Sequence, residues 1–351
     1  MAPGGEMASD EQAKSIDWYR VPVEQAALKA IYKRSDFMGF LQTGGYLGLL
    51  IVTGGLSLYS VKHFPWPLAL LMFFVHGMCY AFMINAVHEL LHDTVFKTKS
   101  LNKLFAHVFA FLGWINHYAF DASHVRHHRS TLHPPDDLEV VVPIQFTVKD
   151  FIKSSFVNPW GILWVVKNTL RMAQGKFQGD WELKLFPKDR PDKRRPVMNW
   201  AKTLLIGHGL ILIVSICTKC WFLPVVTTFA PFYGGWLFFL CNNTQHVGLQ
   251  DNTSDFRLCC RTFIPNPIVR FLYWHMNYHT EHHMYVGVPC YNLGKLHKLI
   301  EHDLPPAPVG LYATWVEIGA ILRKQKEDPT YQHDPMLNAC RESRSLIKTT
   351  V

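Results

Sequence analysis

Residues 64–92 read FPWPLALLMFFVHGMCYAFMINAVHELLH, and this stretch decides how the chain folds. From Phe64 to Val87 it contains no Asp, Glu, Lys or Arg. That length exceeds the roughly 20 residues that a helix needs to cross a bilayer. The same stretch then runs without a break into His88 and His92. It therefore predicts a membrane-spanning helix that carries a histidine pair at its end.

Three more apolar segments accompany this one. Residues 37–59 are uncharged, 200–217 carry only Lys202 near one end, and 221–241 follow after a short turn. Buried core helices would explain the shorter third segment alone, but not four segments in two tight pairs. We therefore predict an all-α integral membrane protein. Four transmembrane helices in two hairpins are expected at about 37–59, 64–87, 200–217 and 221–241.

The placement of charge predicts the orientation of the chain. The net charge is +8, yet the turns within the two hairpins carry only Lys62 and Lys219. By the positive-inside rule, the remaining basic segments and both termini face the cytosol. We expect a cytosolic arm at 1–36, one membrane domain at 37–330 and a tail at 331–351. The membrane would be the endoplasmic reticulum in a eukaryote or the inner membrane in a bacterium. No nucleic-acid-binding motif occurs.

Eight of the 19 histidines fall into three clusters on the predicted cytosolic side. Residues three and four apart share one face of a helix, so each cluster can aim two or three imidazoles at one point. The clusters follow the ends of spans, which lets them meet despite their distance in sequence. They are HELLH (His88, His92), HVRHH (His124, His127, His128) and HTEHH (His279, His282, His283).

This number of imidazoles predicts two metal ions. A tetrahedral zinc takes four ligands, so eight convergent histidines are too many for one ion. Imidazole suits iron, copper and zinc alike, which leaves the metal open. HELLH also matches the H-E-x-x-H helix of zinc proteases, with Glu89 as the base. That alternative leaves the other two clusters without a role. A catalytically silent lipid sensor is a further alternative.

The three clusters in this order resemble the histidine boxes of the membrane fatty acid desaturase–hydroxylase superfamily. The residues around the third box, HTEHHMYVGVPCYNLGKLHKLI, are similar to those of the acyl-lipid desaturase branch of this superfamily. The resemblance implies two non-haem irons, O₂ activation and four transmembrane helices in a mushroom shape. It also implies His246 and Asn242 as additional metal-binding residues, with His275 outside the ligand set. Four carboxylates beside the boxes could orient imidazoles: Glu89, Asp93, Asp121 and Glu281.

The resemblance also implies an activity on an unactivated C–H bond of a fatty acyl or other lipid-like substrate. Desaturation is the first expectation; hydroxylation, epoxidation and oxidative decarboxylation stay open because one oxidant can give each. Two electrons per turnover would come from a separate NAD(P)H-dependent donor, either cytochrome b5 or ferredoxin with its reductase. A basic loop could dock an acidic donor, or face solvent or lipid headgroups. Its five cations are Lys188, Arg190, Lys193, Arg194 and Arg195.

Overall fold

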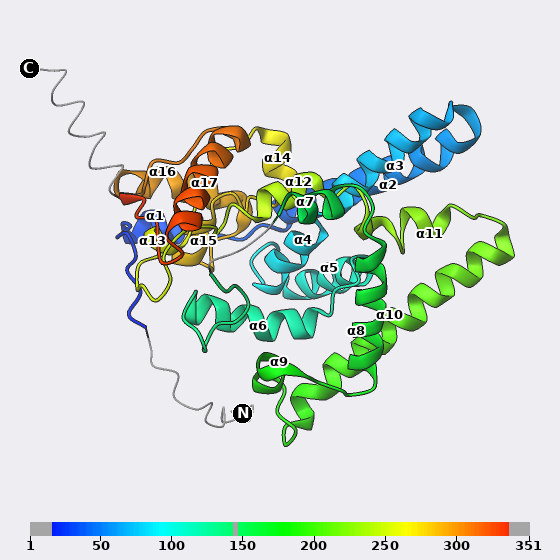
Figure 1. Ribbon diagram of the computed structural model, residues 1–351, viewed down its shortest axis with the longest axis horizontal. Helices are drawn as coiled ribbons and strands as arrows, with labels where there is room; N and C mark the ends of the chain where they lie inside the picture. The colour runs from blue at the N-terminus through cyan, green and yellow to red at the C-terminus, as the bar shows by residue number, and fades with distance from the viewer. Residues whose placement is uncertain (1–15, 143–146, 337–351) are drawn as a thin grey trace, which may run out of the picture.

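The computed structural model describes residues 16–142 and 147–336, and every regular element within these two ranges is helical. The predicted all-α class is thus confirmed. Long helices extend to one side of the molecule, while short helices form a body at the other (Figure 1). Residues 1–15 of the predicted arm and 337–351 of the predicted tail lie outside the described residues, as do residues 143–146.

Within residues 16–142 and 147–336, three helical stretches are long and apolar enough to cross a membrane. The first is α2 (Asp36–His63). The second joins α3 (Trp66–Tyr80) to α4 (Met83–Leu91), and the third is α10 (Pro191–Thr218). They contain the first three predicted spans. Large apolar side chains on these helices are exposed, which is the pattern of a surface that faces lipid. Examples are Ile51, Leu70 and Ile206.

The fourth predicted span, 221–241, is not one continuous helix. It consists of α11 (Leu223–Val226), the 3₁₀ turn η1 (Ala230–Phe232) and α12 (Trp236–Asn242). The sequence contains the causes, because Pro224 and Pro231 cannot donate a helical hydrogen bond and Gly234 adopts a positive φ of 71°. The segment nevertheless returns from the far end of α10 to the body (Figure 1).

Side chains from other parts of the chain satisfy the backbone of this broken segment. The His76 Nε2–H on α3 donates to the Val226 carbonyl over 2.9 Å. The Trp114 indole N–H donates to the Thr228 carbonyl, also over 2.9 Å. Irregular backbone is tolerated at membrane depth only where its polar groups find partners inside the protein. These bonds explain how residues 221–241 can lie against the spans without forming a helix.

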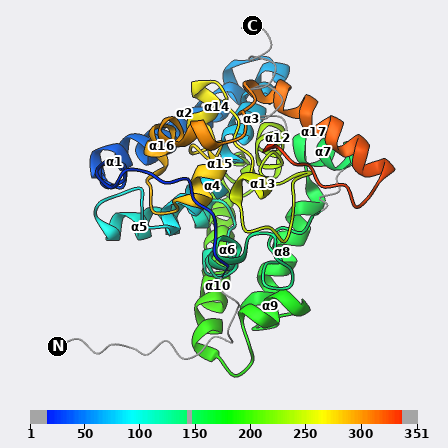
Figure 2. The same ribbon diagram turned by 90° about the vertical axis from the view of Figure 1, so that its left-hand side faces the viewer.

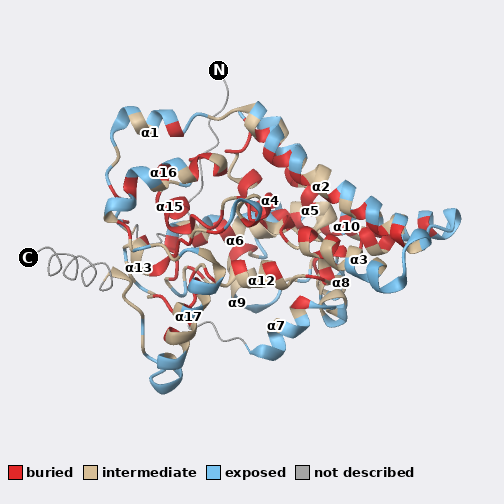
Figure 3. Cartoon of the chain, turned by 90° about the horizontal axis from the view of Figure 1, so that it is seen from above, coloured by how far each residue is buried: buried red, intermediate tan, exposed pale blue. Residues whose placement is uncertain are grey.

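The remaining helices build the body around α4 (Figure 3). Before α10 they are α1 (Gln25–Ile31), α5 (Lys99–Leu112), α6 (His117–Ser130), α7 (Val148–Ser155), α8 (Pro159–Ala173) and α9 (Gly179–Leu185). After α12 they are α13 (Phe256–Cys259), α14 (Pro267–Leu272), α15 (His279–Met284), η2 (Cys290–Asn292), α16 (Leu293–Ile300), η3 (Glu301–Asp303) and α17 (Gly310–Glu327).

The start of α6 is fixed to the third membrane helix. The Asn116 side chain accepts from the Ala119 N–H as an N-cap, and its Nδ2 donates to the Val197 carbonyl on α10 over 2.9 Å. The Trp200 indole N–H donates to the Ile115 carbonyl over 2.8 Å. An N-cap starts the helix at a defined residue. The second histidine box therefore begins at a fixed position relative to the membrane helices.

Candidate metal centre

The structure brings nine histidines together in two adjacent groups, within each of which the candidate ligand atoms lie within 4.8 Å of one another. These are the eight box histidines and His246. Seven of the nine are buried, and His92 and His128 are half-buried. The five-histidine group contains His88, His92, His124, His128 and His282. The four-histidine group contains His127, His246, His279 and His283.

Each three-histidine box divides between the two groups. On α6, His124 and His128 join one group while His127 joins the other. On α15, His279 and His283 stay together while His282 crosses over. Side chains four apart project almost in line, whereas a step of three residues turns the direction by about 60°. Two histidines of each three-histidine box therefore aim at one point, within the expected two or three, while the third aims at the other group. Both α6 and α15 thus bridge the two groups.

The ring nitrogens inside each group are spaced as ligands of a common ion would be. The Nε2–Nε2 separations are 2.9 Å for His128–His124 and 3.1 Å for His282–His128, and 2.9 Å for His279–His246 and 3.1 Å for His283–His279. Imidazole nitrogens bind metals at about 2.1 Å, so two at right angles around one ion lie about 3.0 Å apart. The Nε2 atoms of His88 and His92 are buried and have no hydrogen-bond partner among the described residues. These residues fit a metal ion in each group.

Protein acceptors hold several rings with Nε2 facing inward. His127 Nδ1 lies 2.8 Å from Asp137 Oδ2, and His124 Nδ1 lies 2.8 Å from Glu139 Oε1. His246 Nδ1 lies 2.7 Å from the carbonyl oxygen of Cys259. A carbonyl can only accept, so the proton of neutral His246 is on Nδ1 and its Nε2 carries a lone pair. Such partners fix the orientation of a metal-binding imidazole.

The electrostatics keep most of these histidines neutral. Burial, followed by repulsion from nearby imidazoles, lowers the pKa of His92 and of His246 to about 3. The same causes hold the pKa of five further box histidines well below the ordinary histidine value: His124, His128, His279, His282 and His283. Metal binding requires neutral imidazole, so the centre presents ligands that need not lose a proton first. His127 differs, because Asp137 raises its pKa against the effect of burial.

The carboxylates fulfil the sequence expectations only in part. Glu89 Oε1 lies 3.0 Å from His88 Nδ1 and 3.6 Å from His282 Nδ1, in agreement with an orienting role. Glu281 instead accepts from Thr262 and contacts His297 on α16, so it orients no box histidine. Asp93 and Asp121 form no ion pair with a box histidine in the described part of the chain.

The partners that sequence reasoning missed are Asp137 and Glu139. Both lie in HPPDDLEV, the turn that follows the second box, and Asp137 is fully buried. Asp137 also accepts from the backbone N–H groups of Leu132 and Glu139, which fold the turn back over α6. Acidic residues directly after a histidine box were the available signal, because ligand imidazoles commonly donate to carboxylates.

Two sequence predictions concerned residues next to the boxes. His275 lies outside both groups, as expected, although it precedes the third box by only four residues. Asn242 lines a cavity together with His246 and His279. Its position beside the four-histidine group agrees with the predicted contact to metal, and its role as a ligand remains a prediction.

The cavity beside the two groups measures about 230 Å³. Histidines of both groups form part of its wall: His88, His124, His127, His246 and His279. Its apolar wall consists of Ile84, Phe120, Val140, Phe238 and Met276. Asn85, Glu139, Asn242 and Gln245 complete the lining. An apolar chain inside this cavity would lie against both histidine groups at once.

Comparison with known proteins identifies this constellation. The sequence profile named fatty acid desaturase matches residues 64–315, which include every histidine of both groups. The chain belongs to the fatty acid desaturase family. It is also 25% identical over 282 residues to sphingolipid delta(4)-desaturase DES1 of Xenopus tropicalis, covering 78% of this chain and 77% of that protein.

Family membership removes the zinc-protease alternative that the sequence had left open. HELLH belongs to a desaturase-family centre, so His88 and His92 are part of a five-histidine group and not of a zinc-protease helix. Together with the apolar helices, the family indicates a membrane protein of the desaturase or hydroxylase type.

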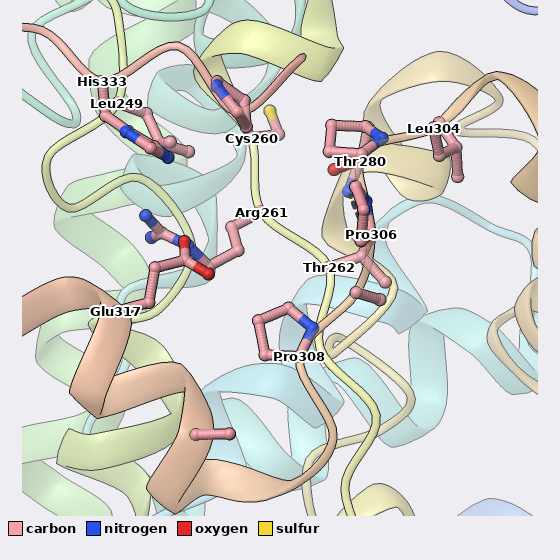
Figure 4. Close-up of a pocket in the computed structure, with 14 residues that line it drawn as sticks. Leu249, Cys260, Arg261, Thr262, Thr280, Leu304, Pro306, Pro308, Glu317 and His333 are labelled. Carbon is pink, nitrogen blue, oxygen red and sulfur yellow. Dashed lines mark hydrogen bonds and ion pairs between the residues drawn. The ribbon is translucent and has the colours of Figure 1, made fainter. Parts of the chain in front are cut away.

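Arg261 holds the turn that carries His246 in this desaturase-family chain. Its Nη1 donates to the carbonyls of Thr244 and Val247, over 2.8 and 3.0 Å, on either side of His246. Its Nε donates to Glu317 on α17 over 3.3 Å. Figure 4 shows Arg261 beside Glu317 on the wall of a separate cavity of about 380 Å³. The side chain is buried and acts on the centre through the backbone of its ligand turn.

Replacing Arg261 with methionine should weaken metal retention at the four-histidine group by about 10–100-fold, the usual cost of losing a group that positions a ligand. Two buried carbonyls would lose their donor, and His246 would lose its fixed position. Metal content after challenge with a chelator should fall toward one ion per chain, because the five-histidine group does not contact Arg261.

Arg257→Met is the matched control for this prediction. Arg257 lies four residues before Arg261, but its guanidinium pairs with Asp255 and Asp303 and not with the carbonyls of the His246 turn. Its replacement should leave the metal content unchanged. Two results would refute the role of Arg261 in positioning His246. One is equal metal retention in the two variants, and the other is loss of both ions together in Arg261→Met.

Proposed function

We propose that this chain is an O₂-dependent di-iron oxidoreductase that desaturates a fatty acyl or other lipid-like chain. One observation carries the proposal: the 230 Å³ cavity with a largely apolar wall is bounded by histidines of both groups. Membership in the fatty acid desaturase family and the name of the Xenopus relative support desaturation over other outcomes. Hydroxylation, epoxidation and decarboxylation are the other outcomes open to the same centre.

The nine histidines would hold two irons, five around one and four around the other. Bound iron, with O₂ and two electrons, supplies the oxidising power needed to break an unactivated C–H bond, which no acid–base side chain can do. Glu139, Asp137 and the Cys259 carbonyl keep the ring nitrogens aimed inward. The remaining task of the chain is to place one carbon of the substrate beside the centre and exclude water.

The cavity would hold only the reacting part of a lipid. Its volume falls below the roughly 300–1,000 Å³ that pockets for whole ligands occupy. Phe120, Phe238 and Met276 supply apolar contacts for a methylene segment. Asn85 also lines the cavity, and its Oδ1 is buried without a hydrogen-bond partner in the described structure. A substrate hydroxyl or amide N–H near the reacting carbon would satisfy that oxygen.

Electrons would come from a separate cytochrome b5 or ferredoxin with its reductase, on the cytosolic side. The basic loop predicted to dock this donor is partly engaged with its own chain. Arg190 pairs with Asp192 over 2.8 Å, and Arg194 lies over the Phe177 ring. Steering by charge would still raise the encounter rate with an acidic partner. Unchanged turnover after neutralising all five cations would reject this docking site.

The product identifies the reaction. The chain should be expressed with a matched donor, and lipids and small metabolites should be analysed by mass spectrometry. Desaturation predicts product that is about 2 Da lighter than its substrate, whereas oxygen insertion predicts a gain of about 16 Da. Products of unchanged mass with a competent donor would contradict the proposed oxidation.

A further inference from the structure

We propose that a pocket between α6, α9 and α10 binds the phosphate group of an anionic phospholipid. The pocket measures about 370 Å³, within the range of small-molecule sites. The proposed oxidation does not use it, and the site would exist whatever reaction the metal centre performs. Figures 1 and 2 both show these three helices next to one another.

The pocket lies on the back of the helix that carries the second histidine box. Arg126 and Arg129 line the pocket, whereas His124, His127 and His128 belong to the metal groups. At 3.6 residues per turn, the two arginines lie on the face of α6 opposite the three histidines. The sequence thus gives α6 two distinct faces, and only one of them is used by the metal centre.

The charge of the pocket favours an oxyanion. The guanidinium groups of Arg126 and Arg129 have no acidic partner in the described part of the chain, and Lys193 adds a third cation to the wall. One acid, Asp136, also lines the pocket, but its carboxylate pairs with Lys184 over 2.8 Å. Arginine is well suited to phosphate because its planar fork can donate two parallel hydrogen bonds.

Most of the remaining wall is apolar, apart from Tyr118 and Ser130. Such a wall favours a ligand that joins a phosphate to an apolar chain. Val125 and Phe186 contribute to it, and Pro196 closes it from α10. A soluble phosphate would leave these surfaces unused. An amphiphile would cover them and place its anionic group on the arginines.

The depth of the pocket matches the lipid headgroups. Pro196 precedes Trp200, where the apolar part of α10 begins, by four residues, or about 6 Å along the helix. The headgroup layer is about 5–8 Å thick on each side of the hydrocarbon core. The bond from Asn116 to the Val197 carbonyl places the start of α6 at the same level. Basic residues at this depth attract anionic lipids.

Native mass spectrometry of the full-length protein in detergent tests the proposal. The probes are phosphatidylglycerol and phosphatidylcholine with identical acyl chains. We expect preferential binding of phosphatidylglycerol, and the Arg126→Gln/Arg129→Gln double variant should lower that binding about 30-fold. Lys99→Gln/Lys103→Gln is the matched control, since both lysines are exposed on α5 away from the pocket. This control should change the binding by less than about twofold.

Several outcomes would overturn the proposal. Equal binding of the two lipids, or unchanged phosphatidylglycerol binding in the double variant, would exclude a built anionic-lipid site. Displacement of the lipid by millimolar inorganic phosphate would assign the pocket to a soluble phosphate compound. If the double variant bound phosphatidylglycerol normally but turned over more slowly with an acidic electron donor, the surface would be a protein-docking site. Melting temperatures serve as a control: if they are equal for all variants, a loss of lipid binding does not come from misfolding.

Discussion

Replacing His282 with alanine is expected to abolish product formation, lowering activity by at least about 100-fold. Losing a residue that only orients a metal ligand lowers activity by up to about 100-fold. His282 is proposed to be a ligand itself, so its loss should cost at least as much. Its ring is fully buried, and its Nε2 lies 3.1 Å from His128 Nε2. The metal content should fall at the five-histidine group, because the remaining rings cannot supply the missing nitrogen. Product yield and metal content on the same preparation measure both effects.

His275→Asn is the control for this substitution. His275 lies four residues before the third box and outside both groups, so its loss should leave metal content and product nearly unchanged. Asparagine suits the position because His275 has a positive φ of 60°, a conformation that asparagine tolerates. Full activity of His282→Ala, or equal inactivation of both variants, would contradict the assignment of ligands.

The second large effect concerns the contact between α3 and the broken return segment. Alanine at Gly77 should lower the melting temperature by roughly 5–10 °C, corresponding to about 2–3 kcal/mol of overpacking. A methyl group at Gly77 would collide with the Tyr233 ring and with its carbonyl oxygen, and backbone cannot move aside as a side chain can. Thermal unfolding in detergent provides the measurement.

Gly44→Ala separates this collision from a general intolerance of the membrane helices. Gly44 lies on α2, and nothing lies within 4 Å of the position where its Cβ would be. Alanine there should leave the melting temperature unchanged or raise it, because glycine costs a helix about 0.5–1 kcal/mol relative to alanine. A stable Gly77→Ala protein would mean that residues 221–241 do not pack against α3 as described.

The sequence predicted the parts of the fold that depend on simple periodicities. Uncharged runs such as 37–59 must be helical in a bilayer, because no other structure satisfies the backbone of a single span there. The i, i+3, i+4 spacing of His124, His127 and His128 likewise predicts one helix face. These two patterns correctly predicted three of the long helices and brought all eight box histidines into the candidate site.

Other features depend on contacts that spacing does not contain. Residues 221–241 have the hydropathy of a span, but the bonds from His76 and Trp114 that stabilise their broken form come from distant parts of the sequence. The role of Asp137 depends on a turn that folds back over α6. Glu281 adjoins His282 in sequence, yet its carboxylate points to His297. Adjacency in sequence places two side chains about 100° apart on a helix, so it is a poor guide to such pairs.

The division of each three-histidine box between the two groups follows from helix geometry once the partners are known. His127 joins His246 because that residue approaches α6 from the turn after α12, as their rings lie 5.2 Å apart. No sequence pattern specifies that approach. The resemblance to known desaturases supplied His246, and the structure showed which group it joins.

Metal analysis of the purified full-length protein tests the central claim most directly. The chain should be produced with iron available, freed of loosely bound ions and analysed for iron, zinc and copper against protein concentration. Two groups of imidazoles in a desaturase-family chain predict about two irons per chain. A single zinc per chain, or no bound metal in folded protein, would contradict the two-metal centre and the oxidation proposed to depend on it.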